Sequence, residues 1–390
     1  MNLAGKHRKI VCVLLVIILI LPFINISYAD GKFDVRAKSA ILLDFNSGEI
    51  IYEKNHHDKL PPASITKIMT LILTMESLEQ GKIKLDDEVT ISSNASGMGG
   101  SQVYLEEGET QTVENLIKAL CIRSANDASV ALAEHIAGSE ELFVNMMNKK
   151  AKELGMNNTS FMNSTGLPNE SHYTTAFDIS IMSKELMKYP KVHEWLTTYM
   201  MDIKVGKKKD VTQSMVNTNR LIKDYPGTNG IKTGSTNEAG YCLSASAKRG
   251  NLQLICVVLG SETSKIRFEE SKKLFDYGFA NYDSYLIGKK GDILGKISVH
   301  KGNKPYIEAI LEKDAYILIP KGSSNKVEKE IVLPEYKDAP IDKGEQIGEL
   351  ILKINGKDAD KIKIISKEAV EKASFIDMFR KMFRSLLNNE

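Results

Sequence analysis

The chain has 390 residues, with 52 lysines and arginines against 50 aspartates and glutamates and a net charge of +2. This length is enough for two domains with a large core. The balanced charge, and the absence from the sequence of a basic stretch interleaved with aromatic residues, argue against a nucleic-acid partner.

The N-terminus has the three parts of a secretory signal peptide. Three basic residues before position 10 are followed by an apolar run over residues 11–24, and Ala29 ends a small-x-small cleavage site. We therefore expect a signal peptide over residues 1–29 and an exported protein at the outer face of the cytoplasmic membrane. The alternative is an uncleaved membrane anchor, for which the apolar run is short.

A hairpin and a buried helix are expected next. Residues 40–55 contain two strand-like runs on either side of an Asn-Ser-Gly turn. Two prolines then precede a helix that starts near Ser64 and ends at Gly81. This helix is apolar nearly all round, which predicts a central, buried position.

The first turn of that helix contains an S-x-x-K motif, with Ser64 as candidate nucleophile and Lys67 as candidate base. Side chains three residues apart on a helix project from one face. A serine hydroxyl is weak until a base removes its proton, and burial can lower the pKa of a lysine enough for that task. Taken alone, the motif would favour the alternative of Ser64 as a helix N-cap.

An S-x-N motif lies in a break between two helices predicted over residues 113–122 and 127–137. The hydroxyl of Ser124 could pass a proton between the base, the nucleophile and a leaving group. The amide of Asn126 can both donate to and accept from a substrate amide. Helix capping is the structural alternative for this motif.

Further helical patterns cover residues 140–155 and 175–188. Three strands are then predicted over residues 230–235, 241–247 and 252–259, followed by a helix over residues 266–282. The order strands, helices, strands, helix predicts an α+β fold, in which an antiparallel sheet formed from both ends of the domain is flanked by helices. We expect this domain to span residues 30–283.

The first of these late strands carries a K-T-G motif. Lys232 and Thr233 could hold an anionic carboxylate, and Gly234 would let a substrate backbone lie close to the strand. The backbone N–H groups of Ser235 and Ser64 could form an oxyanion hole. Each motif alone has a plain structural alternative, here a strand turn, but the three in this order after a signal peptide predict a serine enzyme without a catalytic histidine.

Three cysteines remain after the predicted signal peptide, namely Cys121, Cys242 and Cys256. An odd, widely spaced set is no disulfide framework. A bridge between Cys242 and Cys256 across a hairpin stays open, beside the simpler expectation of buried thiols.

The C-terminal third has a different sequence pattern. Short alternating segments between glycine, lysine and aspartate turns predict a small all-β domain over residues 284–365. Residues 366–390 predict an amphipathic helix with six large apolar residues on one face and three basic residues on the other: Phe375, Phe379, Met382, Phe383, Leu386 and Leu387, against Arg380, Lys381 and Arg384. This pattern is typical of an in-plane membrane anchor, and the alternatives are packing on the β domain or a partner helix.

With these residues in view, the chain resembles the low-molecular-weight penicillin-binding proteins that are serine-type D-alanyl-D-alanine carboxypeptidases, peptidase family S11. The ordered motif set is typical of penicillin-binding proteins and class A β-lactamases. Matching segments beyond the motifs include N-S-T-G-L-P from Asn163 and H-Y-T-T-A from His172. The resemblance runs from about Lys38 to the C-terminus and includes the small β domain and the terminal anchor.

The resemblance implies that Ser64 forms an acyl-enzyme with a peptidoglycan stem pentapeptide, that Lys67 accepts its proton, and that Ser124 assists proton transfer. It also implies substrate binding by Lys232 and by Arg267, the latter near the terminal carboxylate. The implied reaction is hydrolysis of the terminal D-alanine, which limits cross-linking and remodels the wall. β-Lactams would act as inhibitors that trap the serine, and no metal or cofactor is implied.

Many members of the family carry histidine at the position of Ser235, but the role expected there belongs to the backbone N–H group.

Other functions remain as alternatives. A β-lactamase would need a water-activating carboxylate, and no matching motif occurs between Ser124 and Lys232. A non-catalytic wall-binding scaffold would have no reason to keep the motif residues. The seven histidines form no H-E-x-x-H pattern, which argues against a zinc peptidase.

Overall fold

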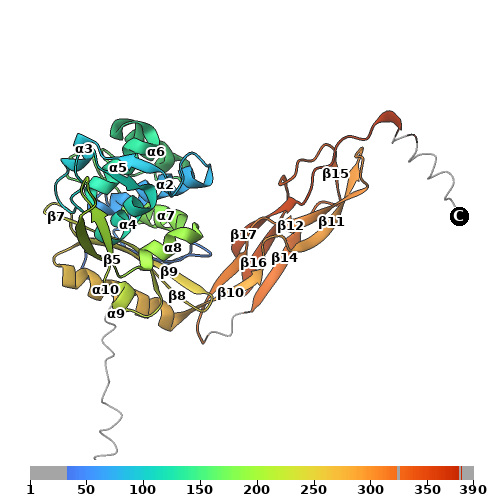
Figure 1. Ribbon diagram of the computed structural model, residues 1–390. Coiled ribbons are helices and arrows are strands. Elements are labelled where there is room, and N and C mark those ends of the chain that lie inside the picture. Colours follow the sequence, from blue (N-terminus) through green and yellow to red (C-terminus); the bar gives the residue numbers. More distant parts are fainter. Residues whose placement is uncertain (1–32, 323–325, 377–378, 380–390) are drawn as a thin grey trace, which may run out of the picture. The chain divides into compact units, whose positions relative to one another are not determined.

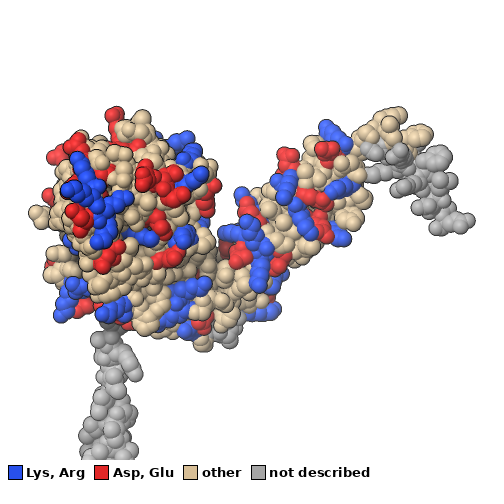
Figure 2. All heavy atoms as spheres, viewed as in Figure 1, with Lys and Arg blue, Asp and Glu red and all other residues tan. Residues whose placement is uncertain are grey.

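The structure is a computed structural model that describes residues 33–322, 326–376 and 379 (Figure 1). The signal peptide predicted for residues 1–29 lies outside the described residues. On the face shown in Figure 2, lysine and arginine are interspersed with aspartate and glutamate, as the nearly balanced charge of the chain leads one to expect.

A five-stranded antiparallel sheet in the order β2-β1-β9-β8-β7 forms the framework of the N-terminal part. Its strands are β1 (Ser39–Asp44), β2 (Ile50–Lys54), β7 (Thr228–Thr236), β8 (Gly240–Arg249) and β9 (Leu252–Ser261). The first hairpin therefore joins strands that come much later in the chain, with Ile41 opposite Val257. The predicted α+β class, with strands from both ends of the domain, is confirmed.

Helices cover both faces of this sheet. Figure 1 shows α10 on one face and α7 and α8 on the other. The helices are η2 (Ala63–Thr66), α2 (Lys67–Glu79), α3 (Ser93–Ser96), α4 (Val113–Arg123), α5 (Asn126–Ala137), α6 (Glu140–Glu153), α7 (Ala176–Leu186), α8 (Pro190–Thr197), α9 (Leu221–Asp224) and α10 (Ser264–Asn281). Two small antiparallel strand pairs complete this part, β3 (Glu88–Thr90) with β4 (Thr110–Thr112) and β5 (Met200–Val205) with β6 (Val211–Val216).

The buried central helix predicted after the two prolines is α2. Every residue from Lys67 to Met75 is buried. Its hydroxyl groups are satisfied within the core, since Thr74 Oγ1 donates to the carbonyl of Thr70 at 2.8 Å. The differences from the prediction are local: Ser64 lies in the 3₁₀ turn η2, the α-helix itself begins at Lys67, and it ends at Glu79 and not at Gly81.

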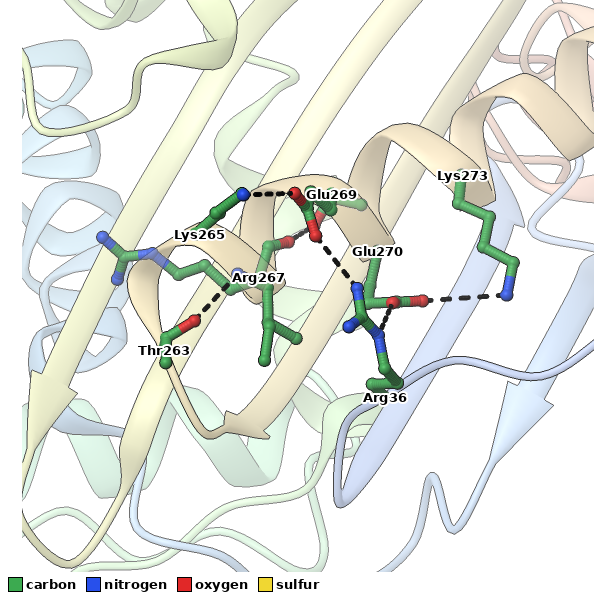
Figure 3. Close-up of polar contacts among 9 residues, drawn as sticks. Arg36, Thr263, Lys265, Arg267, Glu269, Glu270 and Lys273 are labelled. Atoms are coloured by element: carbon green, nitrogen blue, oxygen red, sulfur yellow. Dashed lines mark hydrogen bonds and ion pairs between the residues drawn. The ribbon is translucent and has the colours of Figure 1, made fainter.

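Helix α10 forms ion pairs with Arg36, which lies three residues before β1 (Figure 3). Arg36 donates to Glu270 at 2.7 Å and to Glu269 at 2.9 Å. Glu270 is buried, and its carboxylate raises the pKa of the Arg36 guanidinium. Arg267, on the same helix, points away from these ion pairs (Figure 3).

The C-terminal part is all-β, as predicted. β10 (Tyr282–Gly288) pairs with β13 (Ala315–Pro320), and a six-stranded sheet has the order β14-β16-β17-β12-β11-β15. Its strands are β11 (Ile293–His300), β12 (Tyr306–Leu311), β14 (Val327–Val332), β15 (Tyr336–Asp338), β16 (Gln346–Ile354) and β17 (Lys357–Ser366). Alternate residues such as Ile297 and Val299 on β11 point into a separate hydrophobic core.

The chain keeps pairing with this β structure beyond residue 365, where the sequence predicts the domain to end. Val370 forms a bridge with Ile341 and is buried. Helical conformation starts at Phe375, whose exposed fraction is 80%. The rest of the predicted amphipathic helix, residues 377–378 and 380–390, lies outside the described residues. Among the described helices, none is long and apolar enough to cross a membrane.

The cysteines Cys121, Cys242 and Cys256 are free and buried. In the β8–β9 register Cys256 lies opposite Ala245, three residues away from Cys242. The open question of a bridge between Cys242 and Cys256 is thereby answered in favour of buried thiols.

Candidate active site

The turn η2 and the start of α2 bring the first motif together. Lys67 Nζ lies 3.1 Å from Ser64 Oγ, and Ser64 is half-buried while Lys67 is fully buried. Lys67 Nζ also donates to Asn126 Oδ1 at 2.6 Å and to the carbonyl oxygen of Thr165 at 2.7 Å. The amine of Lys67 therefore contacts the first motif, the second motif and a loop that contains none of the three motifs.

These contacts fit an uncharged amine that acts as a base. A neutral amine has two N–H groups and one lone pair. The oxygens of Asn126 and Thr165 can only accept, so they take both N–H groups. The lone pair then faces Ser64 Oγ, whose hydroxyl can donate to it. Burial lowers the pKa of Lys67 well below its usual value, and the nearby Lys232 lowers it further.

The second motif lies between α4 and α5, as predicted. Ser124 ends α4 in the left-handed conformation, with φ of +64°, and Asn126 begins α5. Asn126 Nδ2 donates to the carbonyl of Gly99 at 2.6 Å, so both ends of this amide are engaged. Ser124 Oγ is buried and has no hydrogen-bond partner among the residues that the structure describes.

The loop over residues 163–167 supplies a backbone contact to the base. Asn163 Oδ1 accepts from the N–H groups of Thr165 and Gly166, which shapes the loop so that the Thr165 carbonyl reaches Lys67. Gly166 has φ of +84°, and a Cβ there would lie 1.8 Å from the carbonyl oxygen of Ala63. Only glycine therefore lets this loop lie against the turn that carries the nucleophile.

The side chain of His172 contacts the turn η2. Its Nε2 lies 2.9 Å from Thr66 Oγ1, and burial lowers the pKa of the imidazole to about 4. The ring is therefore neutral at physiological pH and acts as a structural partner. The sequence points to this stretch only through the resemblance, because a backbone carbonyl such as that of Thr165 leaves no residue-type signature.

The third motif lies on β7. Lys232 is buried and donates to the carbonyl of Thr233 at 3.0 Å, and Thr233 Oγ1 lies 2.7 Å from Thr218 Oγ1. Burial lowers the pKa of Lys232 to about 7, and the charge of Arg267 acts in the same direction.

Gly234 has a role in the fold besides the predicted one. Its predicted role, to make room for a substrate backbone, stays a prediction. A Cβ at this position would lie 2.9 Å from the backbone nitrogen of Ser64 and 3.0 Å from that of Ile65. The absent side chain thus lets the turn η2 pack directly on β7, next to Ser235.

Arg267 lies behind the third motif. Its Nη1 donates to the carbonyl oxygens of Gly234, at 3.1 Å, and of Cys242, at 3.2 Å. Nη2 donates to Ser264 Oγ at 3.2 Å, and burial lowers the pKa of the guanidinium to about 10. The side chain thus ties α10 to β7 and β8 at the motif glycine.

The predicted residues therefore gather at one place, where η2, α2, the α4–α5 break and β7 meet. In the part of the chain that the structure describes, no three histidine, cysteine, aspartate or glutamate side chains are grouped in a way that could hold a metal ion. The arrangement can activate a serine hydroxyl and hold an anionic group beside it.

Comparison with known protein families gives two matches. The sequence model of peptidase family S11, described as D-alanyl-D-alanine carboxypeptidase, matches residues 26–263. The model of the penicillin-binding protein 5 C-terminal domain matches residues 282–372.

Individual relatives and solved structures agree with these matches. D-alanyl-D-alanine carboxypeptidase DacF of Bacillus subtilis is 45% identical over 381 residues, which cover 96% of this chain and 97% of that protein. Penicillin-binding protein 5 of Haemophilus influenzae superposes with a TM-score of 0.75 at 33% identity, over 87% of this chain and 99% of that one. Penicillin-binding protein D2 of Listeria monocytogenes in its cefotaxime-bound form gives a TM-score of 0.57 at 30% identity, over 63% and 98% of the two chains.

Proposed function

The chain belongs to the S11 family of D-alanyl-D-alanine carboxypeptidases, and on this premise we propose that it removes the terminal D-alanine of peptidoglycan stem pentapeptides through an acyl-enzyme on Ser64. The observation that carries the proposal is the contact of Lys67 Nζ with Ser64 Oγ, at 3.1 Å, beside the contacts of the same nitrogen with Asn126 Oδ1 and the carbonyl oxygen of Thr165.

In the proposed acylation, Lys67 takes the hydroxyl proton while Ser64 Oγ attacks the carbonyl carbon of the penultimate D-alanine. The oxyanion lies between the N–H groups of Ser64 and Ser235, which the close packing of η2 on β7 supports. The proton reaches the nitrogen of the leaving D-alanine through Ser124, whose buried hydroxyl is otherwise unpaired in the described structure. Water then attacks the ester with Lys67 as base, and the shortened peptide is released.

Recognition of the terminal carboxylate is assigned to Lys232 and Thr233, with Asn126 contacting the substrate amide. Arg267 contributes positive charge from behind the strand and fixes the Gly234 carbonyl. Through this reaction the enzyme would limit cross-linking and remodel the wall. β-Lactams would acylate the same serine, in keeping with the cefotaxime-bound form of the Listeria relative.

A penicillin-labelling experiment with a D-alanine release assay tests the proposed function. We expect a label that remains stable after removal of free penicillin, and release of D-alanine from a pentapeptide. A label that is lost rapidly, with turnover of penicillin, would identify a β-lactamase instead. Neither label nor release would identify a scaffold without catalysis.

The pKa of Lys232 gives a prediction about pH. Since kcat/KM reports the free enzyme, its value for a free-carboxylate peptide should fall as the pH rises above about 7, where Lys232 loses its proton. The C-terminal amide of the same peptide should show no such fall. Lys232→Arg keeps its charge throughout and should remove the alkaline limb. An alkaline limb of equal size for both peptides would contradict carboxylate binding by Lys232.

We also propose export followed by membrane attachment through the C-terminal segment. In its described part, Phe375, Ile376 and Phe379 have exposed fractions of 80%, 63% and 54%. These apolar groups suit the boundary of a lipid surface, and each of the three basic residues among them would add about 1 kcal/mol on anionic lipid.

Truncation tests this attachment. A chain that ends at Ser374 keeps the buried Val370 and should be as active on a small peptide as the mature chain. It should fail to sediment with anionic vesicles that the mature chain binds, because the apolar stripe is missing. Salt should weaken binding of the mature chain only in part. Equal sedimentation of the two chains would argue that the segment packs on protein instead.

A further inference from the structure

Asp127, the second residue of α5, is a fully buried carboxylate to which the proposed mechanism gives no role. Its Oδ2 accepts from the backbone N–H groups of Val103 and Leu105, both at 3.1 Å, and the N–H of Tyr104 also bonds to this carboxylate. Its Oδ1 accepts from the N–H of Ala128 at 2.9 Å. All of these partners are donors, which fits an ionised carboxylate, because it can only accept.

The backbone that Asp127 holds has an unfavourable conformation of its own. Tyr104 has φ of +61°, in the left-handed region that bulky residues rarely adopt, and its exposed fraction is 59%. A strained conformation of this kind persists where the surrounding structure over-determines it. Bonds from three consecutive N–H groups to one carboxylate provide that support, so the loop over residues 99–105 depends on Asp127.

The same loop orients the side chain of Asn126. The backbone N–H of Asn126 donates to the carbonyl of Ser101 at 2.7 Å, and Nδ2 donates to the carbonyl of Gly99 at 2.6 Å. A carbonyl oxygen can only accept, so the amide nitrogen has to face Gly99 and the amide oxygen faces Lys67 Nζ, at 2.6 Å. Gly100, with φ of +80°, lets the loop lie this close, since a Cβ there would lie 2.9 Å from Asn126 Nδ2.

Asp127 also acts on Lys67 through its charge. Burial has the largest effect on the pKa of Lys67 and lowers it, and Lys232, from β7, lowers it further. The carboxylate of Asp127, from α5, acts in the opposite direction. A base needs enough affinity for a proton to take one from a serine hydroxyl, and Asp127 opposes the loss of that affinity on burial.

We propose that Asp127 is a positioning residue for the reaction: it fixes the loop over residues 99–105 so that Asn126 presents its amide oxygen to Lys67. This inference rests on the proposed carboxypeptidase function, in which Lys67 is the base, and adds a residue that acts through Asn126 and Lys67. Because its charge acts on the same amine, the role has a signature in the pH dependence of acylation.

Asp127→Asn tests the proposal in single-turnover penicillin labelling of the mature chain over a series of pH values. The plateau rate should fall by about tenfold to hundredfold, because an amide nitrogen cannot accept from the N–H groups of the loop. The acid limb, where Lys67 loses its proton, should move to lower pH by about one pH unit, since the charged amine loses a favourable partner. The alkaline limb should stay in place, because the charged groups that act on Lys232 are Cys121 and Arg267.

The chain offers a matched control in Asp178. This carboxylate is also buried in the first turn of a helix, α7, and also holds a loop, since it accepts from the N–H of Asn158 at 2.9 Å and from Thr159 Oγ1 at 2.7 Å. Asp178→Asn should destabilise the fold by a similar amount and leave both limbs in place. An equal move of the acid limb in this variant would assign the shift to general loosening and overturn the inference.

Two glycine variants test the loop without a change at Asp127. Gly100→Ala places a methyl group 2.9 Å from Asn126 Nδ2 and should slow acylation by about tenfold or more. A Cβ at Gly99 would meet no atom within 4 Å, so Gly99→Ala should slow acylation much less. Both glycines are exposed, so both variants should fold. Acylation of Gly100→Ala at the parent's rate would show that the loop does not orient Asn126.

The outcomes separate this inference from the function on which it rests. An acid limb that stays at the parent's pH in Asp127→Asn would overturn the inference and leave the carboxypeptidase function standing. A parent chain that takes no penicillin label would overturn both. If Asp127→Asn fails to fold, the comparison of the two glycine variants decides the question.

Discussion

Ser64→Ala should release no measurable D-alanine and take up no penicillin label, while the protein folds as before. The loss in kcat should reach about 10⁴-fold to 10⁶-fold, as for other enzymes that lose a nucleophile acting as a unit with its base. The side chain of Ser64 contacts Lys67 Nζ and not the backbone of the turn, so removing Oγ should leave η2 in place. Thermal unfolding of the variant should therefore be close to that of the parent.

The chain provides a matched control for this variant. Ser298 also begins an S-x-x-K sequence, but it lies exposed on β11, and its lysine, Lys301, pairs with Asp338 at 2.8 Å. Ser298→Ala should keep full activity and labelling. Residual labelling of Ser64→Ala at the parent's rate would show that another residue is the nucleophile.

Lys67→Met should lose almost as much activity as the nucleophile variant. Methionine keeps an unbranched side chain but has no lone pair that could take the proton of Ser64, so acylation by penicillin should slow by about 10³-fold or more. Lys67→Arg should not rescue it, because a guanidinium stays protonated. Single-turnover labelling measures this step directly, and acylation at the parent's rate would exclude Lys67 as the base.

Lys67→Met can also be compared with the parent through its stability. The folded-state pKa of Lys67 lies below its unfolded value, so between these two values the unfolded chain binds more protons. The free energy of unfolding of the parent should therefore rise with pH across that window, relative to Lys67→Met. A lysine with only a structural role and an ordinary pKa would give no such difference.

The sequence predicts the elements of the site well and their contacts less well. Ser64, Lys67, Asn126 and Lys232 could be found because side-chain chemistry needs particular residue types in a particular order. The Thr165 carbonyl could not, since any residue supplies a backbone oxygen.

Gly234 shows the same limit. Its residue type predicts close approach of a substrate backbone, which stays a prediction, but it does not reveal that the backbone of Ser64 also lies close to it. Likewise, the sequence could not exclude a Cys242–Cys256 bridge, because the outcome depends on the strand register, which sets Cys256 opposite Ala245.

The C-terminal helix predicted from the sequence begins too early, at residue 366. Residues 366–374 read as polar and helix-compatible, yet the bridge of Val370 with Ile341 adds them to the β structure. Val370 and Lys372 form bridges with Ile341 and Gly302, which lie earlier in the chain, and only the tertiary structure contains that information.

The strand order β2-β1-β9-β8-β7 has a consequence for when the sheet can form during synthesis of the chain. All three motifs are complete once the chain has been made as far as Gly234. One of the two strands that pair with β1, however, is β9 (Leu252–Ser261), which is made later. A growing chain that already holds every reactive residue therefore still lacks the sheet on which they meet, and pairing over so long a stretch is slow to form. The complete sheet, and with it the meeting of the three motifs, therefore depends on a strand that is made after all of them.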